Sequence, residues 1–286
     1  MTYELNVQIS KHLLTPLAQP GAVSLIEAAL VQTLEGGRAA LPLLPHVATQ
    51  ALELANNPDS TVREFSELVM KDPPIAARFL ATANSALYSR GQTIRSVSDA
   101  VARIGLAASR DLVFQVVYAS TMNGMKHFQV EVQSSFRRSV LCGVVCRTAA
   151  PVLNLDISDA YLCGLLHDIG ESRVYRILDE SKQVPSAEEA RMLVHKYHPR
   201  AGAELAMRWA LPDDIVQVCR RHEEQGPVEG DRLRLVRLAD LIVPCIESSP
   251  EVSALPELTA QLAEIGISTE KAQAVLERGL SAAARL

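Results

Sequence analysis

Apolar residues recur at helical spacing along most of this chain, and residues that start and stop helices separate the apolar stretches. Residues 46–56 follow Pro45 and end just before Pro58, which predicts a short helix. Thr61 and Glu64 form a capping-box pair ahead of the next apolar stretch, so a second helix is expected to begin there.

The same punctuation continues along the first half of the chain. Asp72, followed by Pro73, predicts the N-terminal cap of a third helix. Ser96 and Asp99 predict the start of a fourth, and Gly105 is its expected end.

Helix starts also dominate the second half. Ser186 and Glu189 repeat the capping box, and Pro199 and Pro212 are each expected to open a helix. The alternating stretch at residues 130–132 is isolated and too short to build a sheet. The predicted fold class is therefore all-α.

Turn residues suggest where the chain divides. Met122-Asn123-Gly124 is the best candidate for a boundary between lobes, and Ser248-Ser249-Pro250 is a weaker one. The expected parts are an N-terminal helical extension (1–37), a helical lobe (38–120), a second helical lobe (121–247) and a C-terminal helical tail (248–286).

Charge argues against broad attraction to nucleic acid. The 286 residues carry a net charge of −5, and 48% of them are apolar, an ordinary globular balance. A local basic cluster, Arg220-Arg221 with Arg232, Arg234 and Arg237, is interpreted as solvated helix faces that pair with nearby carboxylates. Nucleic acid is therefore not an expected partner.

The chain shows no sign of a membrane segment or a leader peptide. No apolar run reaches the length of about 18 residues that spans a bilayer, and Met1–Leu5 lacks a basic, then apolar, signal pattern. We expect no membrane contact and a cytoplasmic location. Five cysteines without a Cys-x-x-Cys pair (142, 146, 163, 219 and 245) are expected to be buried thiols in a reducing compartment.

The residues that could carry chemistry lie in the second half. His167-Asp168 follows an apolar run, 161–166, which predicts a buried helix that delivers both side chains to the interior. His222 and Asp240 each fall on the apolar face of a predicted helix, and His198 precedes Pro199.

Together these five side chains have the composition of a metal site. Imidazoles and carboxylates directed inward from several helices can ligate one ion, and a buried carboxylate needs a cation or several donors. Taken singly, His198 and His222 are more often hydrogen-bonded core histidines, and a residue like Asp240 is more often a surface or ion-paired group. Only the ordered set favours a site.

The ordered series resembles the metal-binding pattern of the HD superfamily of phosphohydrolases, and the first half of the chain resembles the HDOD family within it. The matching phrases are Leu41-Pro42 with Leu44-Pro45, Lys71-Asp72-Pro73, residues 83–88, residues 94–97 through Ile104-Gly105, residues 164–170 and residues 209–212. The resemblance covers about residues 38–245. It implies a multi-helical HD-like bundle (121–247) with an HDOD N-terminal helical lobe (38–120).

Departures from that pattern bear on catalysis. HD hydrolases have a further histidine on the preceding helix, and here Arg138 stands at the position that resembles it. An arginine stays protonated and cannot ligate a metal. The related cyclic-di-GMP phosphodiesterases have lysine where this chain has Glu171, and their Gly-Tyr-Pro signature is missing after His222. A two-metal hydrolytic site is therefore not expected.

Two arrangements of the pocket remain open. In the first, the Arg138 guanidinium replaces the metal by pairing with Asp168, Asp240 or both. Arg138→Ala would then destabilise the fold by a few kcal/mol, because buried carboxylates would lose their compensation. In the second, Arg138 faces solvent and a single divalent ion (Fe, Mn or Zn) stays on the remaining groups.

The resemblance implies a non-catalytic bacterial signalling or scaffold module that acts through protein partners of a signalling pathway. The alternative is a metal-dependent phosphohydrolase or phosphodiesterase that uses His167, Asp168, His198, His222 and Asp240 as ligands. Asn84, Tyr88 and Arg95 are candidates for a partner surface, with capping and lobe packing as the alternative interpretation. The sequence leaves the oligomeric state open.

Overall fold

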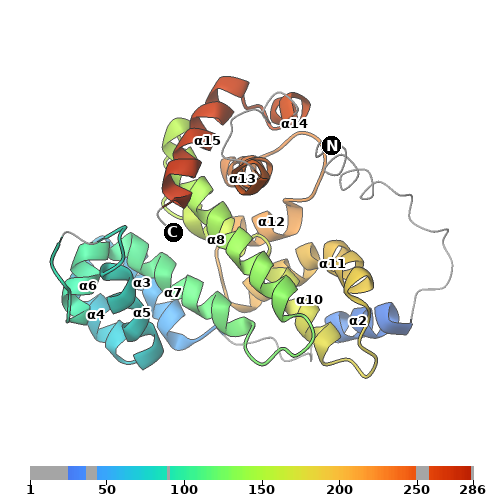
Figure 1. Cartoon of the computed structure of the whole chain (residues 1–286), viewed down its shortest axis with the longest axis horizontal. Coiled ribbons are helices and arrows are strands. Elements are labelled where there is room, and N and C mark those ends of the chain that lie inside the picture. Colours follow the sequence, from blue (N-terminus) through green and yellow to red (C-terminus); the bar gives the residue numbers. More distant parts are fainter. Residues whose placement is uncertain (1–24, 37–43, 89–90, 249–257, 285–286) are drawn as a thin grey trace, which may run out of the picture.

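The computed structural model describes residues 25–36, 44–88, 91–248 and 258–284, and every regular element within these ranges is a helix (Figure 1). The predicted all-α class is thereby confirmed. The helices are α2 (Leu25–Glu35), α3 (His46–Asn56), α4 (Val62–Met70), α5 (Pro73–Ala83), α6 (Val97–Ile104), α7 (Leu106–Thr121), α8 (Gln129–Val152), α9 (Ala160–Leu166), α10 (Ile169–Asp179), α11 (Ala187–Arg208), α12 (Asp213–Arg221), α13 (Asp231–Ser248), α14 (Thr259–Glu264) and α15 (Thr269–Ala283).

Local capping explains why several of these helices begin where they do. The Thr61 hydroxyl accepts from the Glu64 N–H at 3.2 Å, and the Glu64 carboxylate accepts from the Thr61 N–H at 2.8 Å. The Asp72 carboxylate accepts from the Ile75 N–H at 3.1 Å. The Ser186 hydroxyl accepts from the Glu189 N–H at 3.2 Å. Short-range chemistry thus confirms the predicted starts of α4, α5 and α11.

The predicted helix start at Pro199 is wrong. Pro199 lies inside α11, which runs unbroken from Ala187 to Arg208. A proline has no N–H to bond the carbonyl four residues earlier, here that of His195. That carbonyl lies 3.1 Å from His198 Nδ1, which supplies a donor where the backbone cannot. Pro212, by contrast, does stand at the cap of α12.

The molecule has a smaller lobe, α3–α6, joined by α7 to a larger body arranged around the long helix α8 (Figure 1). One hydrophobic core extends through both parts and includes Phe65 and Phe79 in the lobe and Leu162 and Leu165 in α9. The turn between α7 and α8 contains the predicted boundary at residues 122–124.

The two ends of the described chain pack onto the body. α15 lies against α8 and α13, with Val275 and Leu276 fully buried, so the segment predicted as a tail covers part of the core. α2 lies against α10, and its Glu27 carboxylate accepts from Lys196 at 2.6 Å and from Tyr197 at 2.7 Å. The predicted boundary at Ser249-Pro250 and most of the N-terminal extension lie outside the described residues.

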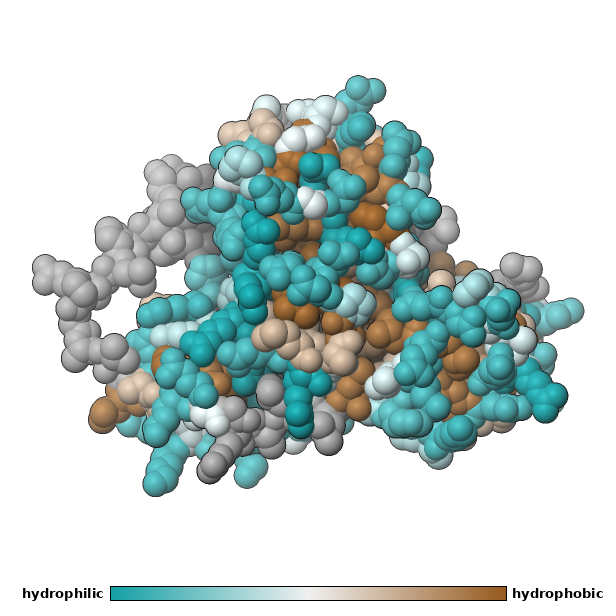
Figure 2. All heavy atoms as spheres, turned by 180° about the vertical axis from the view of Figure 1, so that it is seen from behind, coloured by the Kyte–Doolittle hydropathy of each residue, from teal (hydrophilic) through white to brown (hydrophobic). Residues whose placement is uncertain are grey.

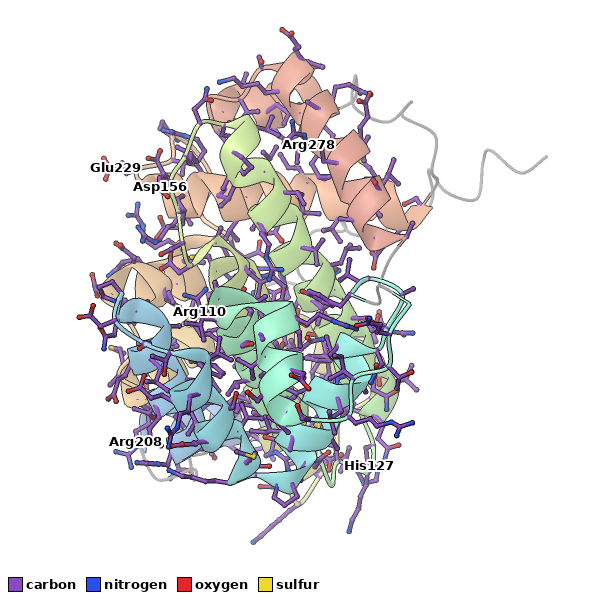
Figure 3. The ribbon with its side chains drawn as sticks, turned by 90° about the vertical axis from the view of Figure 1, so that its left-hand side faces the viewer. Arg110, His127, Asp156, Arg208, Glu229 and Arg278 are labelled. Carbon is purple, nitrogen blue, oxygen red and sulfur yellow. The ribbon has the colours of Figure 1, made fainter. Side chains whose placement is uncertain are left out.

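Polar groups are placed mainly at the surface. Figure 2 shows one face covered mostly by hydrophilic side chains, with smaller apolar areas between them. In Figure 3, Asp156, Glu229 and Arg208 lie at the edges, whereas Arg110 lies near the middle and is 2% exposed. No helix in the described ranges is both long enough and apolar enough to cross a bilayer.

Nearby carboxylates form ion pairs with three of the five arginines in the predicted basic cluster. Arg221 pairs with Glu224 at 2.8 Å, and Arg234 pairs with Asp231 at 2.8 Å. The Arg232 guanidinium lies 3.0 Å from both Asp159 and Asp214. These pairs reduce the positive potential that the sequence suggests for this region.

Candidate functional site

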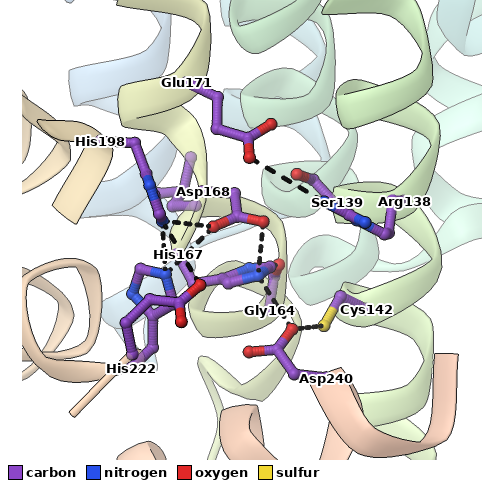
Figure 4. A network of polar contacts seen from close by, with 12 residues as sticks. Arg138, Ser139, Cys142, Gly164, His167, Asp168, Glu171, His198, His222 and Asp240 are labelled. Carbon is purple, nitrogen blue, oxygen red and sulfur yellow. Dashed lines mark hydrogen bonds and ion pairs between the residues drawn. The ribbon is translucent and has the colours of Figure 1, made fainter. Parts of the chain in front are cut away.

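The five predicted site residues meet at one place in the larger body (Figure 4). His167 ends α9 and Asp168 caps α10, so both side chains project from the same tight junction. His198 comes from the middle of α11, His222 from the end of α12 and Asp240 from α13. Four of the five are buried, and Asp240 is partly exposed.

Two glycines allow the helices to approach closely enough for this meeting. A Cβ at Gly170 would overlap the carbonyl of His198 and lie 2.5 Å from the nitrogen of Gly202, so α10 and α11 touch through backbone. A Cβ at Gly164 would lie 2.6 Å from the carbonyl oxygen of Cys142, so α9 contacts α8 in the same way. Glycine is the residue that permits such contact.

Backbone carbonyls orient all three imidazoles. His167 Nδ1 lies 2.7 Å from the Gly164 oxygen, and His198 Nδ1 lies 3.0 Å from the Val194 oxygen. His222 Nδ1 lies 3.1 Å from the Val218 oxygen. Because a carbonyl only accepts, each Nδ1 carries a proton, and each Nε2 turns toward the carboxylates.

Asp168, His198 and His222 form a triangle of ligand atoms. His198 Nε2 lies 3.0 Å from His222 Nε2, and Asp168 Oδ1 lies 3.1 Å from His222 Nε2 and 3.3 Å from His198 Nε2. Atoms that share one divalent ion at bond lengths of about 2.0–2.2 Å stand about 2.8–3.1 Å apart in octahedral geometry and about 3.3–3.6 Å apart in tetrahedral geometry. The donor set, the tautomers and the spacing therefore fit one divalent metal ion.

His167 occupies the space between the two aspartates. Its Nε2 lies 3.0 Å from Asp168 Oδ2 and 3.0 Å from Asp240 Oδ1. The Cys142 thiol, which projects from α8, donates to Asp240 Oδ1 at 3.3 Å. Cys142, His167 and Asp240 thus form a second group of potential ligand atoms next to the first.

Charge inside the cluster is balanced between imidazole and carboxylate. Burial alone would raise the pKa of Asp168, but the charge of His167 and the contacts with all three histidines outweigh it, so this pKa lies well below its usual range. Burial disfavours a charged His167, yet Asp168 and Asp240 raise its pKa well above its usual range. Asp168 likewise raises the pKa of His198 against the effect of burial.

The proposed pairing of Arg138 with Asp168 or Asp240 is wrong. The Arg138 side chain is 48% exposed, and the carboxylate it approaches is Glu171, with 3.9 Å between Nη2 and Oε1. The imidazoles already occupy the aspartate oxygens, and α8 directs Arg138 toward the pocket mouth. Burial disfavours the Arg138 charge, but Asp168, Glu171 and Asp240 together raise its pKa, so a positive charge persists at the rim.

Cys142 and Glu171 lie at the site although the sequence predicts neither as a site residue: it indicates only a buried thiol at Cys142 and, at Glu171, only a departure from the phosphodiesterase pattern. Cys142 lies one helical turn beyond Arg138, a spacing that places both on one face of α8 and that could have indicated it. Glu171 lies in the first turn of α10. Burial and the nearby charge of Asp168 raise the pKa of its carboxyl.

A cavity of about 510 Å³ opens in front of the cluster. Asp168, His222 and Asp240 form part of its wall, and Arg138 and Arg237 add positive charge. Gln261 and Glu264 of α14 complete the wall, although α14 lies outside the part of the chain that carries the sequence resemblance.

The three predicted partner-surface residues lie in the small lobe, far along the chain from this cluster. The Asn84 side chain accepts from the Ile94 N–H at 2.8 Å and donates to the Ile94 carbonyl at 2.9 Å, so it ties a loop to the end of α5. Tyr88 packs partly against the core, and Arg95 is exposed. The packing interpretation therefore describes Asn84 and Tyr88.

Comparisons with known proteins agree with this architecture. The family model of the HDOD domain matches residues 41–225. A Geobacter sulfurreducens HDOD domain protein of unknown function has the same fold, with a TM-score of 0.63 and 24% identity, over 90% of each chain. So has a Shewanella amazonensis protein provisionally described as a metal-dependent phosphohydrolase (TM-score 0.66, 21% identity, 88% of this chain and 97% of the other).

Curated relatives match only in part. An uncharacterised protein of Treponema pallidum is 24% identical over 194 residues, 64% of this chain and 37% of its own length. A ribonuclease Y of Nitratidesulfovibrio vulgaris is 31% identical over 111 residues, 39% of this chain and 17% of its own. The chain thus spans little more than a third of the first relative and less of the other.

Proposed function

This chain belongs to the HDOD domain family, and on that premise we propose that it is a signal-transduction module that acts by binding protein partners rather than by turning over a substrate. The observation that carries the proposal lies on the α8 side of the pocket. Where HD hydrolases have a further histidine, this chain has Arg138, whose charge faces the cavity. A fixed positive charge there opposes a second metal ion.

Cys142 supports the same conclusion. Its thiol is fully buried, and the contact with Cys146, burial and the nearby Asp240 raise its pKa well above the usual range. In the metal-free protein the thiol therefore stays protonated and donates to Asp240 at 3.3 Å. Cys142, His167 and Asp240 thus bind one another, with Asp240 Oδ1 accepting from the thiol and lying 3.0 Å from His167 Nε2. We therefore propose one ion position, at Asp168, His198 and His222.

That single ion would have a structural role in the proposal. It would join α10, α11 and α12 through Asp168, His198 and His222, the three side chains that converge on it. Partners would bind the outer surface of the α3–α6 lobe, where Leu87 is 43% exposed and Arg95 is exposed. Exposed apolar and arginine side chains are typical anchors of protein interfaces.

The second candidate is a metal-dependent phosphodiesterase or phosphohydrolase. The Asp168–His198–His222 triangle favours it, because an ion held there would supply Lewis acidity in an open cavity. Glu171 adds a buried carboxyl whose raised pKa suits proton transfer. The relatives named ribonuclease Y make a phosphodiester the substrate class to test first.

Metal content and turnover separate the two candidates. The purified chain would be analysed for bound metals and assayed with bis(p-nitrophenyl) phosphate, p-nitrophenyl phosphate and a short RNA, with added Zn²⁺, Mn²⁺ or Fe²⁺. The proposal expects about one ion per chain and no turnover. Turnover that disappears in Asp168→Ala and persists in His127→Ala would show that the chain is a phosphohydrolase or phosphodiesterase instead.

The partner role needs a positive test of its own. Proteins cross-linked to the chain in cells would be purified and tested for saturable binding to it. The proposal expects Arg95→Glu to abolish that binding and Asp168→Ala to leave it unchanged. A partner that binds both variants equally would place the interface elsewhere.

A further inference from the structure

A second cavity, of about 800 Å³, is lined by residues of α2 and α10. These two helices are neighbours in the fold (Figure 1). Thr121 at the end of α7 and Leu205 of α11 complete its wall. It shares no lining residue with the cavity in front of the histidine cluster. A volume of this size is typical of small-molecule sites.

Part of the lining of this cavity is apolar. The wall includes Leu25, Ile26 and Leu30 from α2, Ile177 and Leu178 from α10, and Leu205. Leu25 is 84% exposed, so the mouth also presents apolar surface. An apolar wall gains free energy when an apolar ligand body displaces water from it.

Other lining residues carry positive charge. Three cations, Arg173, Arg176 and Lys182, line the cavity with a single carboxylate, Glu180. Glu204 pairs with Arg173 at 2.8 Å and Glu180 pairs with Arg176 at 3.5 Å, so Lys182 supplies most of the unbalanced positive charge. The charge of the wall favours an anion.

Arg173 provides the most specific indication. The residue retains only 7% exposure, and its Nη1 donates to the Ala201 carbonyl at 3.0 Å and to the Glu204 carboxylate at 2.8 Å. Its Nε and Nη2 find no acceptor among the described residues. Buried donors are rarely left without an acceptor, because their lost hydration is not replaced.

We infer that this cavity binds an amphipathic organic anion, a molecule with one acidic group and an apolar body. The acidic group would lie beside Lys182 and Arg173, and a rotation of the Arg173 guanidinium would turn its covered Nε and Nη2 donors toward the ligand. The apolar body would lie against Leu30 and Leu178. Water does not reach these two donors in this structure, and water alone would also leave the apolar wall without a partner. The inference does not depend on the role proposed for the histidine cluster.

The test compares two fluorescent probes that share one aromatic body. 8-Anilinonaphthalene-1-sulfonate carries an acidic group, and N-phenyl-1-naphthylamine is uncharged. The sulfonate is expected to bind the folded chain at one site, about tenfold more tightly than the neutral probe, which is the effect of one charge-assisted contact.

Neighbouring alanines of α2 provide a matched pair of variants. Ala29 lines the cavity and Ala28 does not, and both are exposed, so either accepts a larger side chain without disturbing the core. Ala29→Trp is expected to weaken the binding of both probes at least tenfold. Ala28→Trp should leave both affinities unchanged.

Two charge variants identify the acidic subsite. Arg173→Met keeps the apolar stem. It should reduce the affinity for the sulfonate to about the affinity for the neutral probe. Lys182→Gln, at an exposed position that tolerates change, should weaken the sulfonate alone. Equal affinity for the two probes, or equal binding by the two tryptophan variants, would overturn the inference.

Discussion

His198 Nε2 and His222 Nε2 lie 3.0 Å apart, although both rings direct Nδ1 at a backbone carbonyl. Two neutral rings in that tautomer would bring two lone pairs together. Either an added proton or a metal ion must relieve their repulsion. The contact therefore links metal binding, protonation and stability at this site.

A divalent ion should stabilise the folded chain. At a free concentration of about 100 times its dissociation constant it contributes about 2.7 kcal/mol, which would raise the melting temperature by about 5–10 °C. Calorimetry with Zn²⁺ after treatment with a chelator checks this value. His222→Ala should abolish the rise, whereas His127→Ala, at an exposed position outside the cluster, should retain it.

Without metal, the stability of the chain should fall as the pH rises above about 6.5. The pKa of His167 is raised in the folded state, so its contribution is complete below the unfolded value of 6.5 and is lost as the pH rises through the folded value. Urea titrations of chelator-treated protein between pH 6 and 9 measure this slope. His167→Gln should flatten it, and an unchanged slope in that variant would contradict the prediction.

The contact between His167 and Asp168 also predicts a loss of stability in acid. The pKa of Asp168 is lowered in the folded state, so its contribution is present above the unfolded value of 3.8 and is lost as the pH falls through the folded value. His167 and Asp168 share one interaction, which is counted once. Asp168→Asn should remove the acid slope and much of the alkaline one, as measured by the same titrations.

Gly170→Ala should destabilise the chain by about 1–3 kcal/mol, because the added methyl would force α10 away from the His198 carbonyl. Gly202 lies at the same contact, but a methyl there would meet its nearest atom at 3.2 Å. Gly202→Ala is therefore the matched control, with a smaller expected loss. Equal losses in chemical denaturation would show that the helix contact is not the cause.

Arg138→Ala should change the free energy of unfolding by no more than about 1 kcal/mol. The guanidinium is half exposed and 3.9 Å from Glu171, so water screens the pair. A guanidinium paired with Asp168 or Asp240 would instead cost a few kcal/mol when removed. A loss of that size in chemical denaturation would show that Arg138 pairs with the aspartates.

Asp111→Ala should cost about 3–5 kcal/mol, because it leaves the buried Arg110 uncompensated. Burial raises the pKa of Asp111 even though Arg110 and Arg147 lower it, so the ion pair itself adds little net stability. The double variant Arg110→Met/Asp111→Leu should therefore be close to neutral. Thermal denaturation of both variants tests this difference.

Local chemistry determined most of the fold. The caps at Thr61, Asp72 and Ser186 and the apolar run before His167 depend on residues within one or two turns, so the sequence predicts them directly. The Pro199 prediction was wrong because a helix held by packing on both sides tolerates a missing N–H. The residues next to Pro199 in the sequence do not reveal that packing.

The sequence by itself determined the all-helical class and the set of imidazoles and carboxylates at the pocket. Only the tertiary structure decided their partners: His167 rather than Arg138 between the two aspartates, Cys142 on Asp240, and an arginine with unused donors beside α2. The sequence gives the type of each side chain, but a contact between two helices depends on the distance between them and on the rotation of each about its axis. Those are set by the packing of the whole core.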